Sequence, residues 1–385
     1  MQSQWERITY QDSDREKVWS KSRSFAQDVW FRFRRKPTAL GGLIIIALLL
    51  IFALVGPVLS PYGYSQQDLS LANISPILSV YPAGDGVYFY LNSAQKLIQV
   101  DESGHLVRQL EKVEENFDER WYAFSYGDQG QLVYLDFTVK PYAVKLSQYG
   151  EQIQATARLW NRTYLLGTDH LGRDILTRLM YGTRISMLVA LMAAFVNLII
   201  GILYGGISGY LGGTVDMIMM RIVDIISTIP LTLYVILIMQ VLGAGIQSII
   251  VALGSVYWVD MARVVRGQIL SLKQQEFVLA AKTIGSSATT ILFDHLIPNA
   301  LGSILVTITM LIPSAIFMEA FLGYLGIGLQ PPLASLGTMC NDASANLRTS
   351  PHELLIPALM ICVIMFAFNF VGDGLRDALD PKLKK

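Results

Sequence analysis

The longest uncharged stretch of the chain constrains its fold more than any other feature. Residues 225–259 run for 35 positions without an Asp, Glu, Lys or Arg. As a single α-helix this stretch would be about 50 Å long, whereas the hydrocarbon core of a membrane is about 30 Å thick. The stretch must therefore fold back, and Gly243 and Gly245 mark the natural break. We predict one helix from Met217 to Leu242 and the next from Ile246 to Val265.

Four further apolar runs have the length of a membrane crossing. They cover residues 39–59, 185–207, 295–318 and 354–372, which brings the predicted crossings to six. They also explain why only 16% of the residues are charged, against about 25% in an ordinary soluble domain. A cleaved signal peptide is the alternative for the first run, but that run is longer than a signal core and starts after 38 residues. The predicted fold class is an all-α polytopic membrane protein.

The flanking cations set the expected orientation. Residues 1–38 contain nine Lys or Arg against five Asp or Glu. We therefore expect the N-terminus to be cytoplasmic and, with six crossings, the C-terminus as well. One cluster opposes this assignment, because Arg173, Arg178 and Arg184 precede the second crossing on the predicted outer side.

Between the first two crossings the composition changes. Residues 61–165 regain charge, and strand-forming residues alternate there with turn signals. We predict a small extracytoplasmic β-rich insert. Its role is open between a structural cap and a docking site for an extracytoplasmic partner. The expected strands cover residues 87–91, 96–100, 105–110, 121–126, 131–139 and 142–146, with hairpin loops at 101–104 and 127–130.

Two patterns accompany the second crossing. Thr168 or Asp169 can cap an amphipathic helix that rests in the outer interface, with Arg173, Asp174 and Arg178 on its polar side. Further on, glycines recur at every fourth position, which predicts close packing of the helix against another backbone. These glycines are Gly201, Gly205, Gly209 and Gly213.

Catalysis by this chain alone is not expected. It contains no GxxxxGK[ST] motif for binding ATP, and His352-Glu353 lacks the second histidine of a zinc protease helix. Its two cysteines and four histidines show no metal-ligand spacing, so no metal site is predicted. The formal net charge of zero gives no basic excess for binding nucleic acid.

The loop between the fourth and fifth crossings is the most informative segment. Residues 273–284 are predicted to form a short helix that Gly285 ends in the left-handed conformation. Ser286 or Ser287 can cap the helix that follows. Ala280 and Ala281 would give the short helix a smooth face, as a docking element needs. An ordinary amphipathic connector has the same pattern.

The spacing Ala280-Ala281-x3-Gly285-x12-Pro298 resembles the EAA loop of the permease subunits of ATP-binding-cassette importers. The resemblance implies that residues 273–298 form a coupling loop that docks on a cytoplasmic ATPase.

One position departs from that motif. Leu279 occupies the place of its first acidic residue, while Glu276 lies one turn earlier and is the candidate to face the partner.

Further strings narrow the resemblance to the C-type permeases of dipeptide and oligopeptide importers. They cover residues 166–174, 178–186, 319–328 and 372–381, and the likeness extends over 30–65 and 165–382 in the same order. Together with the composition it predicts a cytoplasmic segment 1–38, a first transmembrane helix 39–60, the insert 61–165, and a permease core 166–385 with five transmembrane helices. The insert is the main departure from the family, whose usual connector is much shorter.

The resemblance also implies partners. A second homologous permease, two ATPase subunits that hold ATP and Mg²⁺, an extracytoplasmic binding protein and the lipid of the inner membrane would surround the chain, which itself would bind no cofactor. Within the same family, nickel, glutathione or another small solute are alternative cargoes to peptides. A membrane receptor that senses a ligand through the insert is the rival from another class.

Three charged residues fall inside or at the edge of the predicted crossings. They are Arg221, Asp224 and Glu319. A charge facing lipid is costly, so each must meet a neighbour, a water-filled path or the interface. Arg221 and Asp224 lie three apart on one helix and can neutralise each other. The alternative is that all three line a substrate pathway. Pro230 and Pro313 are expected to kink the helices nearby.

Overall fold

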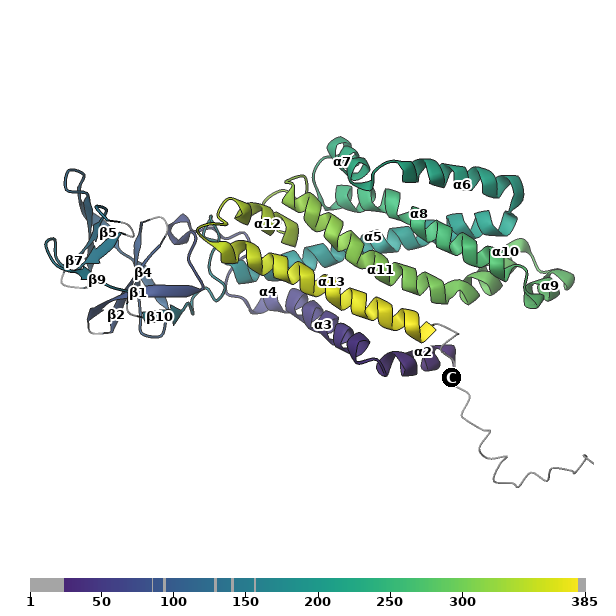
Figure 1. Ribbon diagram of the computed structural model, residues 1–385, viewed down its shortest axis with the longest axis horizontal. Helices are drawn as coiled ribbons and strands as arrows, with labels where there is room; N and C mark the ends of the chain where they lie inside the picture. Colours follow the sequence, from purple (N-terminus) through teal and green to yellow (C-terminus); the bar gives the residue numbers. More distant parts are fainter. Residues whose placement is uncertain are drawn as a thin grey trace, which may run out of the picture.

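The computed structural model describes residues 24–379, except 85, 93–94, 128–129, 140–141 and 156. The protein is elongated, with a bundle of long helices and two small β-sheets at one end of it (Figure 1). The segments 1–23 and 380–385, including the Asp380-Pro381 pair of the 372–381 string, lie outside the described residues.

Five helices of the described chain are long and apolar enough to cross a membrane, or six if one bent pair counts as a single span. The long helices are α3 (Pro37–Leu54), α5 (Ile175–Leu211), α8 (Ile246–Leu272), α11 (Ile297–Tyr324) and α13 (Pro351–Leu379). The shorter ones are α2 (Phe25–Arg34), α4 (Gly56–Leu59), α6 (Gly213–Thr228), α7 (Leu231–Leu242), α9 (Glu276–Thr283), α10 (Ala288–Thr290) and α12 (Leu336–Ser344). A π-helical segment, η2 (Ile291–Leu296), joins α10 to α11, and η1 (Leu69–Leu71) is a single 3-10 turn.

The third predicted crossing is not one helix, which corrects the expectation for residues 217–242. The chain bends by 86° between α6 and α7. The bend falls at Pro230, and Ile229 before it is extended, with φ −80° and ψ 126°. Proline disfavours the helical conformation of the residue that precedes it, which explains the position of the break.

Close packing of α5 against α8 confirms the glycine pattern at three of its four positions. A Cβ on Gly205 would lie 2.3 Å from the carbonyl oxygen of Ala262, and a Cβ on Gly201 would lie 2.4 Å from the Met261 side chain. Gly209 likewise approaches the backbone of Arg266. Gly213 has open space around it, because α5 ends at Leu211.

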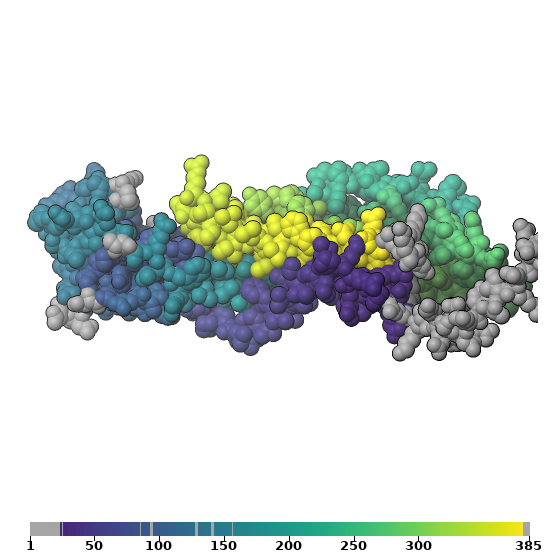
Figure 2. Space-filling model, turned by 60° about the horizontal axis from the view of Figure 1, so that its bottom comes forward, coloured from purple at the N-terminus to yellow at the C-terminus, as the bar shows by residue number. Residues whose placement is uncertain are grey.

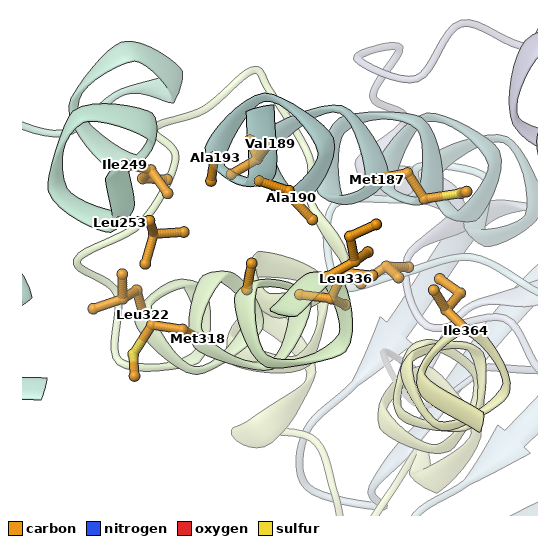
Figure 3. Close-up of a cluster of buried hydrophobic side chains, with 14 of the residues drawn as sticks. Met187, Val189, Ala190, Ala193, Ile249, Leu253, Met318, Leu322, Leu336 and Ile364 are labelled. Carbon is orange, nitrogen blue, oxygen red and sulfur yellow. The ribbon is translucent and has the colours of Figure 1, made fainter. Parts of the chain in front are cut away.

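The main core of the bundle lies where α5, α8, α11, α12 and α13 meet (Figure 3). Small residues of α5, such as Ala190 and Ala193, face larger ones on the neighbouring helices. Among the latter are Leu253 of α8, Leu322 of α11 and Ile364 of α13, all fully buried.

The insert consists of two five-stranded antiparallel sheets. The first has the strand order β10-β1-β2-β3-β4 and the second β5-β6-β7-β8-β9. The strands are β1 (Ile77–Gly84), β2 (Val87–Leu91), β3 (Leu97–Val100), β4 (Leu106–Gln109), β5 (Glu111–Asn116), β6 (Trp121–Tyr126), β7 (Gln131–Asp136), β8 (Ala143–Lys145), β9 (Gln152–Ile153) and β10 (Ala157–Trp160). All six predicted strands are present, and four others were not predicted.

Backbone hydrogen bonds fasten the insert to the start of α5. The amide of Thr168 donates to the carbonyl of Ile74 over 3.0 Å, and its hydroxyl accepts from the amide of Ile74 over 2.9 Å. The amide of Asn73 donates to the carbonyl of Asp169 over 2.9 Å. The first sheet is therefore held directly by the segment that leads into the bundle.

Candidate functional site

Helix α9 has a well-defined stop, as predicted. Gly285 adopts φ +82°, a left-handed conformation that favours glycine, and the amide of Ser286 donates to the carbonyl of Ala281 over 3.0 Å. The hydroxyl of Ser287 then accepts from the amide of Thr290 over 3.1 Å and caps α10. The two short helices therefore form a hairpin of fixed geometry.

The hairpin continues without interruption into the fifth long helix. After α10, η2 leads into α11, and Pro298 lies in the first turn of α11. Because the helical run is continuous here, Pro298 removes one backbone donor from it, directly after the π-helical turns of η2.

One side of α9 is packed against the bundle. Val278 and Ala281 are buried in a cluster that includes Ile269 of α8 and Leu296 of η2. These two α9 residues lie three apart and share a helix face. This corrects the expectation for Ala281, which packs inward, whereas Ala280 is exposed.

The outward side of α9 carries large apolar side chains. Leu279 is 54% exposed and Ile284 82% exposed, and Phe277 is exposed as well. Glu276, at the start of the helix, is also exposed. Leu279, the departure from the acidic motif, thus contributes to an exposed apolar surface. We call Phe277, Leu279, Ala280 and Ile284 the α9 surface.

Phe277 and Ile284 were not predicted from the sequence as part of this surface. They could have been predicted, because they are two large apolar residues at the two ends of a short loop helix, which is too exposed to bury them both.

The hairpin lies at the end of the bundle opposite the β-sheets (Figure 1). Helix α2 and the end of α13 lie at the same end as α9. The described parts of both terminal regions and the α9 surface therefore share one side of any membrane that the long helices cross.

The charged residues at membrane depth are not brought together at one site. Asp224 and Arg221 are both exposed on α6. Asp224 pairs with Arg263 of α8 over 3.3 Å, whereas Arg221 forms no ion pair within the described part of the chain. The expected pairing of Arg221 with Asp224 is therefore wrong, because Asp224 pairs with Arg263 of the neighbouring helix α8 instead.

Arg263 also borders a cavity at the break between α6 and α7. The cavity has a volume of about 380 Å³, and Pro230, Tyr257 and Asp260 are among its lining residues. The guanidinium of Arg263 donates to the hydroxyl of Ser227 over 2.7 Å and lies 3.6 Å from the carboxylate of Asp260. Neither Arg263 nor Asp260 was predicted here, although both directly follow the 35-residue uncharged run.

Glu319 lies in a different environment. It is fully buried in α11, where its carboxylate accepts a hydrogen bond from the hydroxyl of Ser186 over 2.6 Å. The same hydroxyl accepts from the amide of Leu336 at the start of α12 over 3.3 Å. Glu319 therefore joins α5, α11 and α12, and its side chain is fully buried.

Two arginines before the second crossing are buried in a charge network. Arg173 lies 2.7 Å from Asp169 and 3.0 Å from Asp342, and Arg178 contacts both carboxylates, at 3.0 Å to Asp342. Burial opposes the charged form of Asp169, but Arg178 and Arg173 outweigh it and hold the pKa of this carboxyl below its ordinary value.

This network corrects the predicted interfacial helix. No separate helix precedes the crossing in the described chain, since α5 itself begins at Ile175 with Asp174 as its N-cap. The side chain of Asp174 accepts from the amide of Thr177 over 2.8 Å. The arginines do not face the membrane interface, because they pair with carboxylates inside the protein. Asp342 of α12, distant in sequence, provides the second of these carboxylates.

Comparison with known proteins gives a consistent set of relatives. Residues 197–385 match the binding-protein-dependent transport system inner membrane component, and residues 24–76 match the N-terminal TM domain of oligopeptide transport permease C. The oligopeptide transport system permease protein OppC of Bacillus subtilis (strain 168) is 39% identical over 97% of this chain and 94% of its own length. The dipeptide transport system permease protein DppC of the same organism is 37% identical over 94% and 88%.

A solved structure of the MetNI methionine ABC transporter in an inward-facing conformation overlaps 52% of this chain and 96% of its own. Its TM-score of 0.43 and identity of 19% make this likeness too distant to carry an argument. The relatives OppC and DppC, by contrast, are more than 35% identical over nearly the whole chain. The protein therefore belongs to the family of binding-protein-dependent transport system inner membrane components, together with the permeases OppC and DppC.

Proposed function

We propose that the protein is the permease subunit of an ATP-driven importer. With a second homologous permease it would form the membrane pathway for peptides that an extracytoplasmic binding protein delivers. The names of the relatives, oligopeptide and dipeptide transport system permeases, support this cargo. Catalysis would occur on two partner ATPases that hold ATP and Mg²⁺, and this chain would contribute no catalytic residue.

The α9 surface is the observation that carries the proposal. A helix held against the bundle by Val278 and Ala281 presents Leu279 and Ile284 to its surroundings. Exposed apolar side chains at a tip beyond the crossing helices are typical of a protein interface. We therefore assign the α9 surface, with Glu276 at its edge, as the site that docks on an ATPase.

The packing of the hairpin suggests how movement is transmitted. Residues Val278 and Ala281 fix α9 to α8, and the helical run from Ala288 to Tyr324 links it to α11. A push on α9 by a closing pair of ATPases would shift both long helices as a unit. Packed cores switch between discrete arrangements, so such a push favours one state of the pathway over another.

The proposed topology places the α9 surface, both termini and residues 24–36 in the cytoplasm and the insert outside the inner membrane. The bent pair α6 and α7 would complete a sixth crossing. Of the three arginines that oppose this orientation, Arg173 and Arg178 are buried and paired with carboxylates, whereas Arg184 is exposed.

For the substrate pathway, we propose the cavity at the α6–α7 break. It holds the Asp224–Arg263 pair at its border and Asp260 in its wall. The neighbouring helices expose apolar side chains such as Leu237 and Val241, which a second permease or lipid would cover. Arg221 is exposed on the same helix as Asp224, whereas the burial of Glu319 assigns that residue to the core.

Replacing Ile284 with serine tests the docking proposal. Full burial of an isoleucine side chain is worth about 1.5–3 kcal/mol, so we expect Ile284→Ser to weaken ATPase binding roughly thirtyfold. Co-purification of the ATPases and the uptake of peptide by the reconstituted complex measure this loss. Val58→Ser is a matched control, because Val58 of α4 and Ile284 are each 82% exposed and Val58 lies outside the α9 surface and the proposed pathway.

A second pair of variants separates docking from folding. Ala280→Trp adds bulk on the outward face and should block docking while the chain stays in the membrane. Ala281→Trp adds it on the inward face and should destabilise the hairpin itself. Docking that is unchanged in both Ile284→Ser and Ala280→Trp would refute the assignment of the α9 surface.

The cargo is tested by uptake competition in vesicles. The permease should support uptake of di- and oligopeptides in preference to nickel. Glutathione is a meaningful competitor, because the glutathione transport system permease GsiD of Pectobacterium atrosepticum is 41% identical over 57% of this chain. A signal output without associated ATPases would favour the receptor alternative instead.

A further inference from the structure

An open apolar groove lies beside α2, away from the proposed docking and pathway sites. It has a volume of about 450 Å³, within the range of about 300–1,000 Å³ that is usual for ligand pockets. Trp30 and Phe33 of α2 form one wall, and Leu305 of α11 and Leu375 of α13 form the other. Figure 2 shows the purple N-terminal helices lying along the yellow α13.

The position of the groove fixes the depth at which a ligand would lie. Leu43 belongs to the second turn of α3, Leu301 to the first turns of α11, and Leu379 ends α13. All three helix ends lie at the end of the bundle that carries α9 (Figure 1). The groove is therefore level with the boundary between acyl chains and headgroups in one leaflet.

Two exposed cations directly follow Phe33, the last α2 residue of the groove wall. Helix α2 and the residue pair after it contain four cations, Arg32, Arg34, Arg35 and Lys36. Arg32 pairs with Asp28, and Lys36 pairs with Asp377 of α13. Arg34 and Arg35 are exposed, and neither has a carboxylate partner within the described part of the chain. Arg35 instead stacks over the ring of Phe31, with 4.2 Å between its guanidinium carbon and the ring centre.

We propose that this groove is a binding site for one anionic phospholipid of the leaflet on the α9 side. An acyl chain fills the apolar groove, and the phosphate headgroup lies against Arg34 and Arg35. The chemistry on the two sides matches the two parts of such a lipid: a wall of aliphatic and aromatic side chains, and two guanidiniums without a competing carboxylate. Basic side chains next to a membrane-spanning helix attract anionic lipid. The proposal does not depend on the peptide cargo or on the α9 surface.

Charge also argues against another occupant from this chain. Residues 1–23 contain five Lys or Arg and four Asp or Glu, a net charge of +1, so they offer Arg34 and Arg35 no anionic complement. Their apolar residues are scattered rather than grouped into a run that would fill the groove.

Mass spectrometry of the intact transporter tests the site. The complex is reconstituted in nanodiscs of equal parts phosphatidylglycerol and phosphatidylethanolamine, then released into mild detergent, and the retained lipids are identified. We expect phosphatidylglycerol to be enriched on the wild type. The double variant Arg34→Gln/Arg35→Gln should lower that preference about tenfold. Arg348→Gln, which removes an exposed arginine outside α2, is the control and should leave the preference unchanged.

Two further variants test the groove itself. Leu305→Trp should lower the retention of both lipids by filling the groove, whereas Leu359→Trp on the exposed side of α13 should not. A photocrosslinking residue at position 305 should give adducts with the mass of a phospholipid. Equal retention of the two lipids by the wild type, or adducts at 305 with residues 1–23 or with another subunit, would overturn the proposal.

Discussion

Replacing Asp169 with asparagine probes the charge network at the end of the bundle next to the β-sheets. The side chains of Arg173 and Arg178 are 5% and 4% exposed, and that of Asp169 is 8% exposed. Asp342, the second carboxylate, is 31% exposed. Asp169→Asn keeps the shape of the side chain and removes its charge. Both guanidiniums then depend on the partly exposed carboxylate alone.

The expected cost follows from this difference in burial. Removing one partner of a buried ion pair costs about 3–5 kcal/mol, because the charge that remains is left uncompensated. An ion pair at an exposed position is worth about 0–1 kcal/mol. We therefore expect Asp169→Asn to destabilise the protein by about 3–5 kcal/mol, and Asp342→Asn by about 1–2 kcal/mol.

Titration of the detergent-solubilised protein with SDS, followed by the fluorescence of a C-terminal fusion on size-exclusion, measures both losses. Equal effects of the two variants, or a loss below about 1 kcal/mol for Asp169→Asn, would refute the assignment of Asp169 as the centre of the network.

The same carboxyl predicts a dependence on pH. The pKa of Asp169 is lowered in the folded state relative to the unfolded value of about 3.9. Its contribution to stability is complete above that unfolded value and is lost as the pH falls through the lower, folded pKa. The gap in stability between the wild type and Asp169→Asn should therefore be widest near neutral pH and narrow in strong acid. A gap that widens in acid would contradict the direction of the shift.

Two further substitutions test the helix packing and the hairpin. Gly205→Val should cost about 1–3 kcal/mol in the same SDS titration, because its side chain meets the Ala262 backbone. Gly41→Ala, at a helical position with open space, should be neutral or stabilising by up to about 1 kcal/mol. A Gly205→Val protein as stable as the wild type would mean that α5 and α8 do not pack as described. Gly285→Val forces a branched residue into a left-handed conformation at a cost of about 1–2 kcal/mol. It should weaken ATPase co-purification while membrane insertion stays normal; unchanged co-purification would show that the stop of α9 does not shape the docking site.

Hydrophobic length and turn chemistry sufficed to predict most of the helices. Uncharged runs of membrane-spanning length became α3, α5, α8, α11 and α13. Several of these helices extend beyond the runs, as α5 does from Ile175 to Leu211, because a helix continues through charged residues outside the apolar stretch. The bent pair α6 and α7 was predicted as one helix, since hydropathy contains no term for the direction of a chain. Pro230 signalled a kink but not its size of 86°.

The strands divide in a similar way. Strands β2 and β6 match their predicted bounds, because aromatic and branched residues dominate them. Strand β5 is built from Glu, Lys and Asn with a single Val, and it pairs along the edge of its sheet. A solvated edge strand needs no apolar alternation, so its sequence resembles a loop. Strand β1 contains Pro82 and Gly84, which are typical of turns rather than strands.

The hairpin shows what a motif specifies and what it omits. The positions of Gly285 and Ser287 follow from backbone conformation, which local sequence determines, and both predictions are confirmed. Which alanine faces outward depends on the helix phase relative to α8 and η2. That phase is set by Val278 and its contacts with residues distant in sequence. Two adjacent alanines are therefore equivalent in the motif and opposite in the structure.

Arg173 and Arg178 show that local sequence also leaves the partners of a charged residue undetermined. A rule that counts Lys and Arg beside a crossing treats every cation as free to meet the membrane surface. Arg173 and Arg178 instead form ion pairs with Asp169 and with Asp342, which lies more than 160 positions away in the chain. Of the three arginines before the second crossing, only Arg184 remains exposed, whereas Arg34 and Arg35 are exposed at the end of the protein that carries the α9 surface. Contacts between residues distant in sequence therefore reduce, but do not remove, the conflict that a count of cations near the crossings predicts.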